Sequence, residues 1–167
     1  TLLKFVTDQD GRFVLRRLRS ALAVGTAALL IACSGSSPDK LLASARDYIA
    51  KGDNPAAIIQ LKNLLTEAPD NGEARFLLGS ASLEARDFPT AEKELRRALE
   101  LNQPPDAVLP LLARAMTALG QQEALIKDFG SRSLGEPQAQ ATFQTLLGDA
   151  YLQRNDRAAA ERAFTTA

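Results

Sequence analysis

Few side chains in this sequence could do chemistry. The chain has one cysteine, Cys33, and no histidine, which removes the usual general base, the catalytic triads and most zinc sites. The carboxylates are scattered or alternate with bases, as Glu92 and Glu94 do around Lys93, which is typical of a solvated helix face. We therefore expect no enzyme, no metal site and no cofactor. A hydrolase of the cell envelope remains the enzymatic alternative.

Cys33 follows a segment that is typical of secretion. Residues 1–32 contain five basic and two acidic residues, and the basic cluster 16–19 precedes the uncharged apolar run 21–32. These 12 residues would extend about 18 Å as a helix, too little for a hydrocarbon core of about 30 Å. A basic stretch, a short apolar stretch and the small residue Ala32 predict a signal peptide over residues 1–32.

The motif Leu30, Ile31, Ala32, Cys33 resembles the lipobox of bacterial lipoproteins. The resemblance implies cleavage between Ala32 and Cys33, a diacylglyceryl group on the Cys33 sulfur, and an N-acyl chain such as palmitate on the new amino group. Residues 33–37 then form the lipidated cysteine and a flexible tether. Ser34 in place of Asp implies the periplasmic face of the outer membrane of a Gram-negative bacterium. The alternative is a small, buried Cys33.

The body of the chain repeats with a period of about 34 residues. Asp53, Asp87 and Asp156 stand in three similar segments and are separated by 34 and 69 residues, which are one period and two periods plus one residue. In each segment an alanine is followed four residues later by a large apolar residue, in the pairs Ala57 and Leu61, Ala91 and Leu95, and Ala160 and Phe164. A small residue beneath a large one at this spacing is what helix packing requires.

Local signals favour helices throughout the body. Asp53 and Asp87 each precede a proline by two residues, which predicts a capped helix start. Gly79 and Gly148 stand where two helices are expected to approach closely. Because no segment alternates apolar and polar residues over several positions, strands are not expected.

The period and the alanine-to-large spacing resemble the tetratricopeptide repeat, a helix–turn–helix unit. The resemblance implies an all-α, right-handed superhelical solenoid with four units, at 38–71, 72–105, 106–140 and 141–167. The third unit is degenerate, with a loop at 130–137 that is either a tolerated insertion or a functional kink or partner-binding loop. The residues matching the packing pattern are Tyr48, Ala57, Leu61, Leu78, Gly79, Ala91, Leu95, Leu147, Gly148, Tyr151, Ala160 and Phe164.

Solenoids of this family bind proteins or peptides in a concave groove lined by the first helix of each unit. The resemblance assigns to this groove Arg46, Phe76, Ser80, Arg114 and Asp149, with Leu42, Ile49, Leu83, Thr117, Thr145 and Leu152 as further candidates. Each could instead be ordinary surface or packing. Twenty basic and twenty acidic residues give no electrostatic reason to expect nucleic acid.

The lipobox, the tether and the sequence of residues 40–49 and 52–65 are similar to the repeat-containing lipoproteins of the PEP-CTERM/exosortase sorting system. The resemblance covers residues 15–129. It implies a lipid-anchored scaffold for protein–protein interactions, in protein sorting linked to exopolysaccharide export. A lipoprotein of outer-membrane assembly or type IV pilus biogenesis shares both features and is the alternative.

The two ends of the sequence suggest a fragment. The chain begins at Thr1 rather than methionine, and its lead-in to the signal peptide is long. We expect either a missing segment or a true start at Val14 or Leu15. At the other end, Ala167 falls inside the expected second helix of the fourth unit, so we expect further repeats beyond it.

Overall fold

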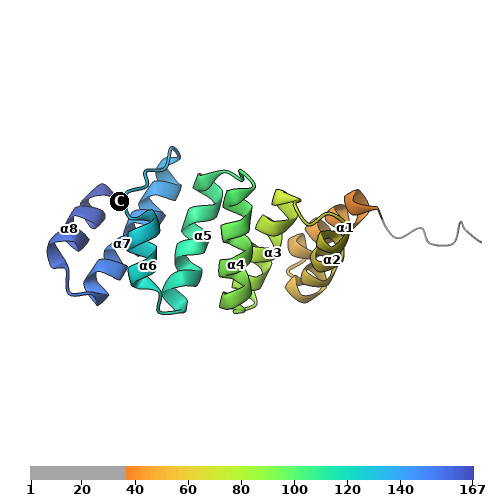
Figure 1. The fold of residues 1–167 in the computed structure, drawn as a ribbon, viewed down its shortest axis with the longest axis horizontal. Helices are drawn as coiled ribbons and strands as arrows, with labels where there is room; N and C mark the ends of the chain where they lie inside the picture. The colour runs from red at the N-terminus through yellow and green to blue at the C-terminus, as the bar shows by residue number, and fades with distance from the viewer. Residues whose placement is uncertain (1–36) are drawn as a thin grey trace, which may run out of the picture. The chain divides into compact units, whose positions relative to one another are not determined.

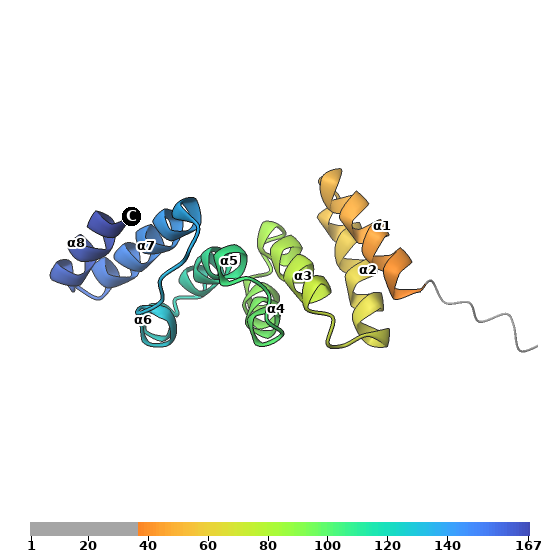
Figure 2. The same cartoon turned by 90° about the horizontal axis from the view of Figure 1, so that it is seen from above.

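The computed structural model describes residues 37–167, which form eight α-helices and, within this range, no strand. The helices follow one another along a row (Figures 1 and 2). This confirms the predicted all-α solenoid of helix–turn–helix units. The predicted signal peptide lies outside the described residues. The helices are α1 Pro38–Ala50, α2 Asn54–Glu67, α3 Gly72–Glu84, α4 Phe88–Glu100, α5 Pro105–Ala118, α6 Gln122–Phe129, α7 Pro137–Gln153 and α8 Arg157–Thr166.

Aspartates fix where three of the four second helices begin. The Asp53 carboxylate accepts a hydrogen bond from the backbone N–H of Ala56 at 3.1 Å, and Asp87 accepts one from Thr90 at 3.3 Å. Asp156 caps α8 in the same way. Such caps satisfy N–H groups that lack a partner within the helix, and each contributes about 1 kcal/mol. The two helix starts predicted from Asp and Pro are confirmed.

The turns inside the four helix pairs share one backbone conformation. Each turn has a single residue with positive φ just before the second helix: Gly52 at 76°, Arg86 at 62°, Gly120 at 72° and Asn155 at 61°. Glycine adopts this left-handed conformation without strain, whereas a residue with a side chain does so at some cost. The repeat is therefore maintained in the backbone even where the residue type changes.

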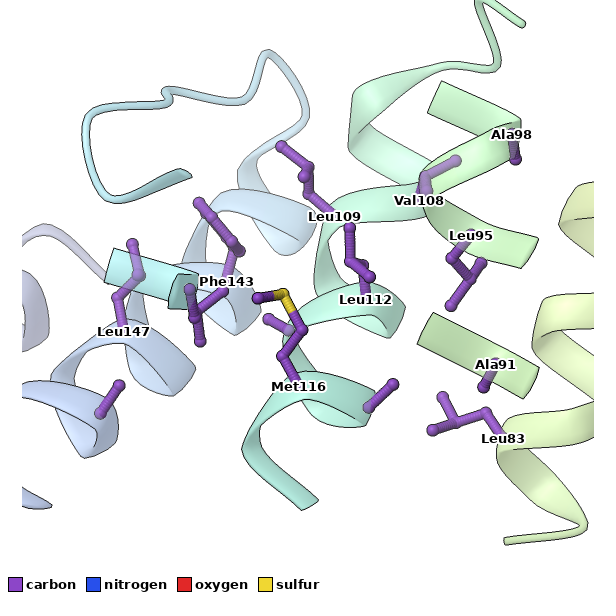
Figure 3. Packing of buried hydrophobic residues seen from close by; sticks show 14 of the residues in the cluster. Leu83, Ala91, Leu95, Ala98, Val108, Leu109, Leu112, Met116, Phe143 and Leu147 are labelled. Carbon is purple, nitrogen blue, oxygen red and sulfur yellow. The ribbon is translucent and has the colours of Figure 1, made fainter. Parts of the chain in front are cut away.

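The apolar interior is divided into two clusters. The first joins α1, α2 and α3 and includes Leu61 and Leu64. The second extends from α3 to α7, and its largest buried side chains include Leu95, Met116 and Phe143. Figure 3 shows this second cluster, with side chains from successive helices packed against one another. No described helix combines the length and the apolar character needed to cross a bilayer.

The third pair departs from the others after Phe129. Helix α6 has 8 residues, whereas α2 has 14 and α4 has 13. The loop that follows covers residues 130–136, and Pro137 belongs to α7 rather than to the predicted loop 130–137. Helix α7 thus begins four residues before the predicted unit boundary at 141, because Glu136 caps it by accepting a hydrogen bond from Ala139 N at 2.6 Å.

Two glycines allow the helices of a pair to approach closely. A Cβ atom on Gly79 would lie 2.6 Å from Cγ of Leu95, and one on Gly148 would lie 2.6 Å from Cζ of Phe164. The partners differ in freedom, because Leu95 is fully buried whereas Phe164 is 39% exposed. The two glycines are at equivalent positions, but Gly79 faces a fixed side chain in the second pair and Gly148 faces a movable one in the fourth.

We expect Gly79→Ala to lower the free energy of unfolding by about 1–3 kcal/mol, because buried Leu95 cannot yield to the new methyl group. In Gly148→Ala the Phe164 ring can turn toward solvent, and alanine favours the helix by about 1 kcal/mol over glycine. This second variant should stay within about 1 kcal/mol of the parent. Urea unfolding followed by circular dichroism measures both. A larger loss for Gly148→Ala would contradict the argument.

Candidate binding surfaces

The predicted lipidation site cannot be placed in this structure. Leu30, Ile31, Ala32 and Cys33 lie outside the described residues, and lipid attachment at Cys33 stays a prediction. Among residues 37–167, no group of three or more Asp, Glu, Cys or His side chains is arranged to hold a metal ion.

The structure places most of the predicted packing residues in the interior. Tyr48 and Tyr151 are half-buried, and Phe164 is more exposed than either of its counterparts Leu61 and Leu95. The fourth pair therefore covers its own large residue less completely than the first two pairs do. The remaining packing residues, all buried, are Ala57, Leu78, Gly79, Ala91, Leu147, Gly148 and Ala160.

The groove candidates all lie on first helices of the pairs. Arg46 is on α1, Ser80 on α3, Arg114 on α5 and Asp149 on α7, at successive intervals of 34, 34 and 35 residues. They therefore occupy one equivalent position in each unit. Because successive first helices are neighbours, these four residues form a row across them. We call this set the groove row.

Both arginines of the groove row are ion-paired to a neighbouring first helix. Arg46 Nε donates to Oε1 of Glu73 at 3.0 Å, and an Arg114 nitrogen lies 3.6 Å from Oε1 of Glu84. The Arg46 and Arg114 side chains are 53% and 49% exposed, and exposed pairs of this kind contribute 0–1 kcal/mol. A carboxylate on a partner could replace either glutamate at little cost.

Two apolar groove candidates lie deeper than the resemblance implies. Leu83 is 4% exposed and belongs to the second apolar cluster. Its assignment to the groove is wrong, because the side chain is buried in a cluster with residues of α4 and α5 and so takes the alternative role of packing. Phe76 is half-buried and packs against the same cluster, so it presents only part of its ring.

A hollow of about 450 Å³ lies on the side of the second helices, between α4, α5 and the end of α6. We call it the α4–α6 hollow. Its apolar lining includes Leu99, Leu109 and Phe129, and its polar lining includes Arg96, Gln103 and Arg132. Of these residues only Arg132 was a binding candidate, as part of the predicted loop 130–137. The sequence signal that pointed here was the pair of glycines and the proline in residues 130–137.

Arg96 connects α4 to α6 beside this hollow. It donates hydrogen bonds to Glu92 and, at 3.2 Å, to Asp128, and its guanidinium lies 5.3 Å from the centre of the Phe129 ring. Burial lowers the pKa of Arg96, but the hydrogen bonds and negative charges of Glu92 and Asp128 raise it by more. Arg96 therefore remains a cation, and it holds α6 against α4 although α6 is short.

Comparisons with known proteins agree with this architecture. Residues 42–107 match the family profile described as Tetratricopeptide repeat. The chain has a tetratricopeptide-repeat fold. A search of curated proteins found no match.

Solved structures of MamA share the fold. One crystal structure of MamA has a TM-score of 0.62 and 24% identity, covering 77% of this chain and 75% of MamA. A second has a TM-score of 0.64 and 22% identity, covering 77% of this chain and 70% of MamA. MamA MSR-1 C2 has a TM-score of 0.66 and 20% identity, covering 78% and 74%. At these identities the likeness concerns the fold alone.

We expect Arg96→Lys to lower the free energy of unfolding by about 1 kcal/mol, because an ammonium cannot bond Glu92 and Asp128 together while stacking on Phe129. The matched control is Arg97→Lys on the same helix. Arg97 pairs with Asp70 and Glu100, both mostly exposed, so its replacement should change stability by less than about 0.5 kcal/mol. Equal losses of unfolding free energy for the two variants, measured by urea unfolding, would contradict the role of Arg96 in holding α6 against α4.

Proposed function

We propose that this protein is a non-enzymatic scaffold that binds polypeptides along the groove row while a lipid on Cys33 holds it at the outer membrane. The observation that carries the binding proposal is the groove row itself. Arg46, Ser80, Arg114 and Asp149 repeat one position across four neighbouring helices, so an extended chain could contact them in succession.

The groove row offers side chains that a polypeptide can use. Arg46 and Arg114 can donate two parallel hydrogen bonds to a carboxylate, Ser80 can donate or accept, and exposed Asp149 can receive a basic side chain. The glutamates that now pair with the arginines are themselves exposed. Exchange of these surface pairs for a partner's groups gives specificity more than raw affinity.

The anchoring proposal rests on the sequence around Cys33. A basic stretch, the apolar run 21–32 and the motif ending in Cys33 occur in the order that secretion and lipidation require. Two or three acyl chains bind a bilayer far more strongly than one, at about 0.8 kcal/mol for each buried methylene. The similarity to PEP-CTERM/exosortase lipoproteins makes sorting linked to exopolysaccharide export the pathway that we propose.

The anchor is tested by Cys33→Ser in the full chain, expressed in a Gram-negative host supplied with labelled palmitate. We expect the parent protein to incorporate the label and to sediment with outer membranes. The variant should lose both properties, because a serine hydroxyl does not form the thioether. Equal membrane association of the two proteins would exclude lipid anchoring through Cys33.

The groove is tested by placing a photo-crosslinking residue at Ser80 or Asp149, with Asn63 on α2 as the exposed control. We expect crosslinked partners from the two groove positions and none from the control. Partners with a C-terminal sorting tag, or from polysaccharide export, would support the proposed pathway. Barrel-assembly or secretin proteins would indicate envelope assembly or pilus biogenesis instead. Crosslinks from Asn63 alone would contradict the proposal that polypeptides bind along the groove row.

A further inference from the structure

One repeat position changes from core to surface in the third unit. Leu64, Ala98 and Arg132 are successively 34 residues apart. Leu64 and Ala98 are fully buried, whereas Arg132 is exposed and lies at the α4–α6 hollow. A position that fills the interior in the first two units therefore borders an opening in the third.

The shortened helix α6 explains the hollow. In α2 and α4 the second helix continues past the position of Leu64 or Ala98, to Glu67 and Glu100 respectively. Helix α6 ends at Phe129, and the chain then leaves as the loop 130–136, which Figure 1 shows between α6 and α7. Beside the missing turn, Leu99, which is half-buried, and Leu109, which is 2% exposed, form the apolar floor of the hollow.

Hydrogen bonds fix the loop just beyond Arg132 and one wall of the hollow. In the loop, Leu134 is 8% exposed and its N–H donates to Oε1 of Gln140 at 2.7 Å. The N–H of Gly135 donates to Oδ1 of Asp106 at 2.8 Å. In the wall itself, Arg96 is held by its hydrogen bonds to Glu92 and Asp128. A wall that is already fixed spares an incoming ligand part of the entropy of ordering it.

The charges at the hollow leave one cation unmatched. Arg96 is paired with Glu92 and Asp128, and the other charged lining residue, Glu100, is paired with Arg97 at 2.7 Å. Arg132 forms no ion pair with any residue in the range 37–167. The hollow thus combines an apolar floor with a free guanidinium at its edge.

We propose that the α4–α6 hollow binds a polypeptide segment of a partner in which an apolar side chain stands next to a carboxylate. The space corresponds to a missing turn of polypeptide, and the apolar side chain would rest on Leu99, Leu109 and Phe129. The carboxylate would receive hydrogen bonds from Arg132. This second site lies on the side of the second helices and does not depend on the groove row.

The test selects phage-displayed random nonapeptides against the full chain and measures the binding of fluorescein-labelled winners by fluorescence polarisation. The decisive variant is Arg132→Glu, whose exposed side chain can be replaced without disturbing the fold. Lys127→Glu is the matched control, since it makes the same charge change on the exposed surface of α6. Arg114→Glu reports on the groove row.

We expect selected peptides to carry Asp or Glu within two residues of Leu, Ile or Phe. Arg132→Glu should weaken their binding about fivefold or more, and the other two variants should change it less than about twofold. Peptides weakened by Arg114→Glu but not by Arg132→Glu would overturn this proposal and support the groove. Failure to select any peptide, or insensitivity to both changes, would overturn it as well. A loss with Arg132→Glu, together with no crosslinks from the groove, would overturn only the proposed function.

Discussion

The structure depends on one constraint, which is that no helix pair can cover its own apolar surface. Leu95, Leu112 and Phe143 come from different pairs, yet all three are fully buried in one cluster (Figure 3). Each is buried in a cluster to which neighbouring pairs contribute side chains as well as its own pair. Close stacking in turn requires small residues where helices cross, and this explains Ala91 beneath Leu95 and the bare backbone of Gly79.

Stacking also determines where function can be located. Residues on the contact faces are committed to the interior, as Leu83 illustrates. Two kinds of surface remain for recognition. One is a row of outward-facing residues, with one residue from each pair, and the other is a place where a pair is incomplete. The groove row is an example of the first kind, and the α4–α6 hollow is an example of the second.

Much of the fold could be predicted from the sequence because its determinants are local. Asp53 and Asp87 act on N–H groups three residues away, and the spacing between Ala91 and Leu95 is a property of a single helix. Such signals can be recognised in the sequence alone. They indicate helix starts, pairings and the period without knowledge of the neighbours.

The surfaces were harder to predict because they depend on which helix covers which. Leu83 is buried in a cluster that includes residues of α5 and α7, more than twenty residues later in the chain. The hollow required knowing that α6 stops at Phe129 and that the loop then leaves along Leu134 and Gly135. The glycines and proline of that segment indicated that the helix would end there. They did not indicate that the cation Arg132 would lie at the edge of a hollow.

The division of the interior into two clusters has a mechanical consequence. Helix α3 gives Ala74 and Leu78 to the first cluster and Leu83 to the second, so α1 and α2 share no buried cluster with α5 or α7. Repeat arrays open in local steps, each with its own free energy. Opening of the first pair would therefore leave the buried contacts among α4, α5, α6 and α7 in place.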